Sequence, residues 1–178
     1  MRTLGYDFSQ IEQNMQQTTT EKPEIKLVGI CARTSYQQEI DKMNGLIFPC
    51  VRKYFHGALF NKIPHRTRPG ATFCAYTDYE SDHTGAYTYF IGEEVSSFDD
   101  PLPEGFHLLT IPKQRYAKFT TKPAPMPEVI VNAWEKIWKM SPKELGGKRS
   151  FLTDFEIYDE RAADHQNIIL DVYVGVQP

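Results

Sequence analysis

Hydrophobic positions divide the first half of the chain into four consecutive elements. The short apolar run IKLVGICAR at 25–33 is typical of a buried strand. Apolar residues then recur at helical spacing over 40–54, where Gly45 and Pro49 should kink or restart the helix. Two strands rich in tyrosine, threonine and phenylalanine follow at 71–79 and 85–95, and the polar turn between them indicates a hairpin.

The second half of the chain shows the same order of elements. Strand residues at 106–120 are broken at Pro112, and 127–140 reads as a helix with a proline in its first turn. The segments 151–158 and 167–176 form a second predicted hairpin. The order recurs after about 70–80 residues. The sequence therefore predicts an α+β fold, a tandem strand-helix-strand-strand pseudo-repeat with an antiparallel sheet and a central ligand cleft.

This recurrence also suggests where the domain begins. Residues 1–24 are polar and have little to bury, so they are predicted to be an N-terminal extension. Residues 25–178 then form one domain of two repeats, at about 25–96 and 104–177. The junction of two such units is a usual place for a ligand.

Composition narrows the class of protein. The 178 residues are 40% hydrophobic, which suffices for a core, and 13% aromatic, which favours a ring-lined cavity. A net charge of -3 argues against a general polyanion binder. No apolar run approaches the roughly 18 residues of a membrane span, and no signal peptide is recognisable. We expect a cytoplasmic protein that does not contact a membrane.

Metal and cofactor motifs are absent from the sequence. The three cysteines are widely spaced and odd in number, which fits a reducing compartment rather than a disulfide framework or zinc site. The five histidines never occur at metal-ligand spacing, and there is no phosphate-binding glycine loop. We therefore predict no metal and no cofactor.

The first candidate for a functional residue is Glu156. Strand alternation places it with Asp154 and Tyr158 on one face of the segment 151–158, opposite a core face. A carboxylate desolvated among rings is costly unless a cation or a hydrogen-bond donor meets it. The alternative is an ordinary strand carboxylate paired with Arg161 or a lysine.

Aromatic residues supply the candidate walls of a cleft. Trp134 and Trp138 are four residues apart on the predicted helix and project to the same side. They are either core anchors or a wall that stacks on a flat or cationic ligand. Tyr76, Tyr87 and Tyr89 lie on the first hairpin, and any of them could face the ligand or belong to a surface tyrosine ladder.

An enzymatic role is a separate possibility. The sequence has no G-x-S-x-G nucleophile motif, which favours a binding protein over an enzyme. A buried acid and a tyrosine hydroxyl can nevertheless perform acid-base hydrolysis. In that case Glu156 would deprotonate water, and Tyr116 or Tyr158 would supply a proton.

Four motifs in order carry a family resemblance that spans residues 26–176. They are KLVGICAR from Lys26, DYESDHTGAYTYFIGEEV at 78–95, IPKQRYAKF at 111–119, and DFEIYDER at 154–161 followed by DVYVGV. This pattern resembles the GyrI-like small-molecule-binding domains, also called AraC-type or bacterial transcription activator effector-binding domains.

The resemblance implies a central cleft in which an acid matching Glu156 meets cationic, often aromatic compounds between tyrosine and tryptophan walls. Similar domains occur fused to DNA-binding helices, as free-standing drug-binding proteins, as a gyrase inhibitor, and as hydrolases of cyclopropane-bearing toxins. Because the sequence shows no DNA-binding module, we expect no direct DNA binding by this chain. The expected function is a sensor or sequestering protein for hydrophobic cations. The alternatives are a hydrolase of reactive electrophiles and an inhibitor that binds a protein partner.

Overall fold

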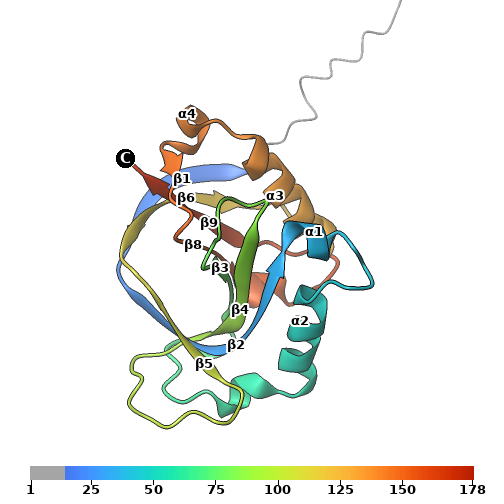
Figure 1. The fold of residues 1–178 in the computed structure, drawn as a ribbon, viewed down its shortest axis with the longest axis vertical. Coiled ribbons are helices and arrows are strands. Elements are labelled where there is room, and N and C mark those ends of the chain that lie inside the picture. Colours follow the sequence, from blue (N-terminus) through green and yellow to red (C-terminus); the bar gives the residue numbers. More distant parts are fainter. Residues whose placement is uncertain (1–14) are drawn as a thin grey trace, which may run out of the picture.

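The computed structural model describes residues 15–178, which form one antiparallel sheet with helices on its outer face (Figure 1). The strand order is β1-β6-β9-β8-β3-β4-β2-β5, and β7 pairs with β9. The strands are β1 (Gln16–Lys22), β2 (Ile25–Ser35), β3 (Thr72–Thr77), β4 (Ala86–Glu94), β5 (His107–Ile111), β6 (Gln114–Thr120), β7 (Lys148–Arg149), β8 (Thr153–Tyr158) and β9 (Asp171–Gln177).

The sheet curls around a core of its own side chains (Figure 1). Seven strands contribute to this inner cluster, which consists of Ile25, Leu27, Phe73, Ala75, Phe90, Ile111, Tyr116, Phe155 and Tyr173. Close strand contact is helped by Gly29 of β2, which lies opposite Gly92 of β4. A Cβ at Gly29 would lie 2.0 Å from the carbonyl oxygen of Ile91, so a side chain there would force the two strands apart.

Helices cover the outer face of the sheet in two groups. The helices are α1 (Tyr36–Glu39), α2 (Ile47–His56), α3 (Glu128–Lys139) and α4 (Pro142–Leu145), with short 3-10 turns η2 (Leu59–Lys62) and η3 (Glu160–Ala162). Cys50 and Tyr54 of α2 pack on β2, β3 and β4, whereas Trp134 and Ile137 of α3 pack with residues of β6 and β9. None of the helices in the described part of the chain is long and apolar enough to cross a membrane.

The predicted α+β fold is confirmed, including the doubled order of elements. In the first unit β2 is followed by α1 and α2 and then by the hairpin β3–β4; in the second, β6 is followed by α3 and then by β8 and β9. The two units meet where β8 pairs with β3, with Cys74 opposite Glu156. Glu156 therefore lies on the strand at the seam between the two repeats.

The structure differs from the predicted N-terminal extension over residues 16–22. This segment, QQTTTEK, forms the edge strand β1 and pairs with β6 from Gln16 opposite Thr120 to Lys22 opposite Gln114. Most of its side chains are exposed, so its polar composition gives no sign of the strand, which is held to β6 by backbone hydrogen bonds. Residues 1–14 of the predicted extension lie outside the described residues.

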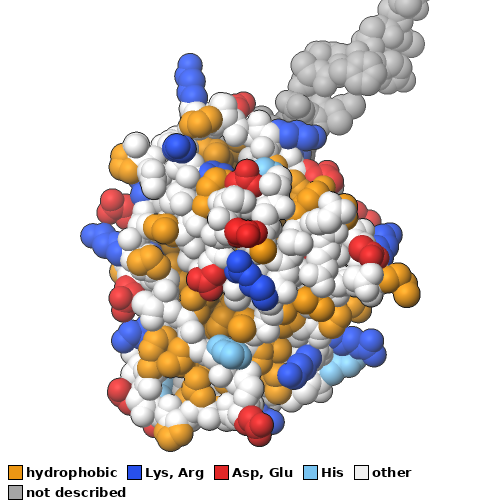
Figure 2. Space-filling view, in the orientation of Figure 1, with side chains coloured by type: hydrophobic (Ala, Val, Ile, Leu, Met, Phe, Trp, Pro, Cys, Tyr) orange, Lys and Arg blue, Asp and Glu red, His pale blue; other side chains and the backbone are white. Residues whose placement is uncertain are grey.

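Charged side chains of both signs are interspersed with hydrophobic ones on the face drawn in Figure 2. This face therefore carries no concentrated basic surface of the kind that phosphate backbones require. In the stretch 15–178, no cluster of three or more histidine, cysteine, aspartate or glutamate side chains is arranged to hold a metal ion.

Candidate functional site

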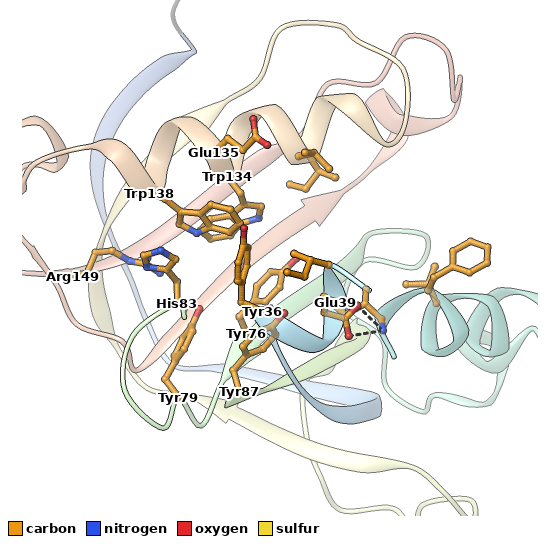
Figure 3. Close-up of a pocket in the computed structure, with 16 residues that line it drawn as sticks. Tyr36, Glu39, Tyr76, Tyr79, His83, Tyr87, Trp134, Glu135, Trp138 and Arg149 are labelled. Atoms are coloured by element: carbon orange, nitrogen blue, oxygen red, sulfur yellow. Dashed lines mark hydrogen bonds between the residues drawn. The ribbon is translucent and has the colours of Figure 1, made fainter. Parts of the chain in front are cut away.

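A cavity of about 480 Å³ lies on the outer face, between the helices of the two repeats (Figure 3). Its walls come from α1, α2, α3 and the strands beneath them. It is lined by Tyr36, Glu39, Ile40, Ile47, Phe48, Val51, Tyr76, Tyr79, His83, Tyr87, Ile130, Val131, Trp134, Glu135, Trp138 and Arg149. The lining is thus largely aromatic and aliphatic, with a few charged groups.

The two tryptophans form one wall, and each has a distinct place. They are one helical turn apart on α3, with ring centroids 6.5 Å apart. Trp134 is buried and its ring contacts that of Tyr76 edge-on at 5.3 Å, whereas Trp138 is half-buried and stacks on His83 at 5.2 Å. Both rings line the cavity, and Trp134 also packs in the core beneath α3.

Glu156 lies directly behind this aromatic wall. Its Oε1 accepts hydrogen bonds from Tyr76 OH at 2.7 Å and from Trp134 Nε1 at 2.6 Å, and its Oε2 accepts one from Tyr158 OH at 2.8 Å. The residue is 2% exposed and is not itself a lining residue. Two of its three donors, Tyr76 and Trp134, line the cavity, so these two rings lie between the carboxylate and the cavity.

The carboxylate of Glu156 has no positively charged partner among residues 15–178. Burial raises the pKa of Glu156 above its usual value, and the hydrogen bonds from Trp134, Tyr76 and Tyr158 oppose that rise. Arg161, the partner considered as an alternative, instead binds Asp159 and Asp171 at 2.9 Å and 2.8 Å. Glu156 is therefore a buried acid held by neutral donors alone.

The tyrosines of the first hairpin lie at different depths. Tyr76 and Tyr87 line the cavity, with ring centroids 5.7 Å apart. Tyr89 packs edge-on against Tyr76 from behind and is 2% exposed. Tyr158 likewise lies behind the wall, where burial, followed by the nearby Glu156 charge, keeps its pKa well above the ordinary value. Tyr89 and Tyr158 can therefore affect a ligand only through Tyr76 or Glu156.

Tyr116 is not brought to this site. It belongs to the inner cluster of the curled sheet, on the face opposite the helices, where it packs against Phe155 and Tyr173. Its hydroxyl accepts a hydrogen bond from Gln114, and burial raises its pKa to about 12. The structure thus does not place Tyr116 beside Glu156 as a proton donor.

A second buried carboxylate, Asp154, lies two residues before Glu156 on β8 and is fully compensated. Arg149 Nη2 binds its Oδ2 at 2.6 Å, Tyr79 OH donates to the same oxygen at 2.7 Å, and the backbone N–H of Gly175 donates to Oδ1 at 2.8 Å. Its side chain is fully buried. The Arg149 guanidinium also lies over the Phe151 ring, 4.2 Å from the centroid.

Residues 18–176 match the model of one family, Cass2, described as integron-associated effector binding protein. The chain belongs to this family. This membership confirms the predicted GyrI-like effector-binding domain. It also indicates that the chain is a small-molecule-binding protein.

Solved structures agree with the Cass2 assignment at the level of the fold. The integron cassette protein from the mobile metagenome of Vibrio cholerae superposes with a TM-score of 0.71 and 24% identity, over 90% of this chain and 95% of that chain. SAV2435, solved bound to tetraphenylphosphonium, superposes with a TM-score of 0.68 and 16% identity, over 92% of this chain and 94% of that one.

One curated relative is similar in sequence. YobU of Bacillus subtilis (strain 168), named a "putative transcriptional regulator protein", is 33% identical over 102 residues. These residues are 57% of this chain and 61% of YobU, so the match spans less than two thirds of that relative.

Sequence reasoning missed several lining residues of this Cass2 protein. Strand alternation would place Tyr79, three residues after Tyr76, on the opposite face, but Asp78 has a φ of 49° and turns the chain, so both rings reach the cavity. His83 and Arg149 lie beyond the regular pattern, in a turn and in the two-residue strand β7. Tyr36 is the first residue of α1, directly after the N-cap Ser35, and it precedes the apolar positions that recur at helical spacing from residue 40. The Arg149–Asp154 pair has no distinctive spacing in the sequence.

Proposed function

We propose that this protein binds hydrophobic, cationic small molecules in the cavity between α1, α2 and α3, as a sensor or sequestering protein. The observation that carries the proposal is the Glu156 carboxylate, which is buried, has neutral donors only, and lies one ring behind the cavity. Such a charge is unfavourable in the ligand-free protein and becomes favourable when a cation enters.

The interaction energies are large enough for useful affinity. At an effective dielectric constant of about 20, two opposite charges roughly 7 Å apart attract by about 2 kcal/mol. A cation against the faces of Trp134 and Trp138 adds about 1–2 kcal/mol where it is desolvated. Burial of the ligand's apolar surface against the remaining lining residues supplies further free energy. Together these contributions support micromolar binding.

Two further facts support the proposal. The cavity volume of about 480 Å³ lies within the range of small-molecule sites. SAV2435, which shares the fold, was solved with tetraphenylphosphonium, a lipophilic cation. This compound is therefore the natural first probe for the present protein.

The proposal is tested by isothermal titration calorimetry with tetraphenylphosphonium on the wild type and Glu156→Gln. The variant keeps the shape of the side chain but removes its charge, so we expect the affinity to fall by roughly tenfold to fiftyfold. Glu93→Gln is the matched control, because Glu93 is also a buried carboxylate, 1% exposed, but is not a lining residue. The Glu93→Gln variant should bind tetraphenylphosphonium with the affinity of the wild type.

Three outcomes would contradict the proposal. The first is no binding of tetraphenylphosphonium by the wild type, and the second is equal binding by the wild type and Glu156→Gln. The third is chemical conversion of electrophilic compounds that depends on Glu156, which would favour the hydrolase alternative. Recovery of the titrated compound unchanged would be consistent with binding alone.

A further inference from the structure

The end of the cavity near Arg149 contains unused hydrogen-bond donors. The guanidinium has five N–H groups, and the hydrogen bond found for it in residues 15–178 runs from Nη2 to Asp154. The buried Nε has no hydrogen-bond partner in the described part of the chain. The side chain is 9% exposed and is a lining residue of the cavity.

Asp154 does not use these remaining donors, because its own oxygens are already occupied. Tyr79 OH and the Gly175 backbone N–H fill the positions that Arg149 leaves open on the carboxylate. The ion pair and the Phe151 ring beneath the guanidinium hold Arg149 in place. The buried Nε lies beyond the reach of a ligand, so the donors open to a ligand acceptor are the Nη N–H groups of Arg149 that do not bind Asp154.

The neighbours of Arg149 favour an acceptor rather than a second cation. His83 lies at the same end of the cavity, and burial, followed by the nearby Arg149 charge, lowers the pKa of His83, so it is neutral at neutral pH. Figure 3 shows Glu39 at the opposite end of the cavity, where its carboxylate already accepts the backbone N–H groups of Leu46 and Ile47. Glu135, the other acid of the lining, is exposed on α3.

We infer that the cavity has an acceptor subsite at Arg149, so that its preferred ligands are aromatic cations that also carry a carboxylate or similar anionic oxygen group. This inference rests on the proposed cation site at Glu156. Trp134 links the two subsites, because its Nε1 binds Glu156 while the Arg149 guanidinium lies 6.0 Å from its ring centroid. A ligand stacked on Trp134 therefore lies close to both the Glu156 carboxylate and the Arg149 guanidinium.

The test compares two probes that differ in a single carboxylate, butyltriphenylphosphonium and (4-carboxybutyl)triphenylphosphonium. Calorimetry on the wild type at pH 7 should show the carboxylated compound binding about fivefold to tenfold more tightly, since a charge-assisted hydrogen bond outweighs its extra hydration. Equal or weaker binding of the carboxylated compound would overturn the inference and leave the proposed function intact.

The matched variant is Arg149→Lys. A lysine keeps a positive charge for Asp154 but lacks the guanidinium fork, so the two probes should bind the variant with equal affinity. A preference for the carboxylated probe that persists in Arg149→Lys would also overturn the inference. If the variant does not fold, the ratio of affinities on the wild type alone decides. Failure of both probes to bind the wild type would contradict the proposed function and this inference with it.

Discussion

Two carboxylates on the same face of β8 are both buried but have different partners. Asp154 and Glu156 are two residues apart, and both are at most 2% exposed. Asp154 has a guanidinium, a hydroxyl and a backbone N–H as partners, whereas Glu156 has two hydroxyls and an indole N–H. The first charge is neutralised within the protein, and the second is not.

Under the proposed function, this difference separates a structural role for Asp154 from a binding role for Glu156. An internal ion pair holds β7 against β8 and fixes Tyr79, but it leaves no net charge for a ligand. Hydrogen bonds from neutral donors keep Glu156 in place without cancelling its charge. In the proposed function, this charge acts on a cation in the cavity beyond Tyr76 and Trp134, which line it.

The largest expected effect is on stability, through matched amide substitutions at these two positions. Asp154→Asn leaves the buried Arg149 charge unpaired, so we expect the free energy of unfolding to fall by about 3 kcal/mol. Glu156→Gln should change it by no more than about 1 kcal/mol, because lost hydrogen bonds are offset by removal of an uncompensated charge. Urea denaturation at pH 7 measures both values. Equal losses would show that the two carboxylates have the same role.

The second prediction concerns pH. Burial raises the pKa of Glu156, so on acidification the residue takes up a proton at a higher pH than an ordinary glutamate. Cation affinity should therefore be full above the raised pKa and should fall, by about tenfold, as pH decreases through it. The same shift makes the folded state relatively more stable below that pKa, and this gain is lost as pH rises through it.

Calorimetry with tetraphenylphosphonium from pH 7.5 down to pH 4.5 measures this dependence. The tyrosines and the cysteine that face Glu156, namely Tyr76, Tyr158, Tyr89 and Cys74, have raised pKa values and stay protonated throughout. Protonation of His83 also opposes a cation, and the dependence that remains in Glu156→Gln reports its share. An identical pH profile in wild type and Glu156→Gln would contradict the assignment of this titration to Glu156.

Much of the fold could be predicted because its patterns are local. Alternation along the hairpins and helical spacing in α2 and α3 are set by backbone geometry, so the doubled order of elements was visible in the sequence. β1 was not, because an exposed edge strand needs no apolar side chains. Gly45 and Pro49 were expected to kink or restart the helix, and a new helix does begin there, because Pro49 lies in the first turn of α2, where a missing N–H is tolerated.

The candidate site was predictable only in part. Glu156 and the tryptophans follow from their spacing on single elements. Tyr116 shows the limit of such reasoning, because strand alternation places a side chain on one of two faces without saying which face the helices cover. Tyr79 and Arg149 depend on turns and on a contact between β7 and β8, which have no period in the sequence.

A third, smaller effect is expected from removing one of the neutral donors. Tyr158→Phe deletes the hydrogen bond to Oε2 but leaves the cavity lining unchanged, since Tyr158 lies behind the wall. Losing one hydrogen bond to the charged form should raise the pKa of Glu156 further. The midpoint of the pH-dependent cation affinity should move up by the same amount. An unchanged midpoint would mean that the other two donors alone set the charge state of Glu156.

The smallest expected effect comes from an acid of the lining that is exposed rather than buried. Glu135 on α3 borders the cavity, so solvent and salt screen its attraction for a cation. Glu135→Gln should weaken equilibrium binding of tetraphenylphosphonium by less than about threefold and should act mainly on the association rate at low salt. Stopped-flow tryptophan fluorescence at two salt concentrations separates these effects. If Glu135→Gln instead weakens binding as much as Glu156→Gln, the attraction for cations arises at the surface, and the contrast between the two buried carboxylates does not explain ligand binding.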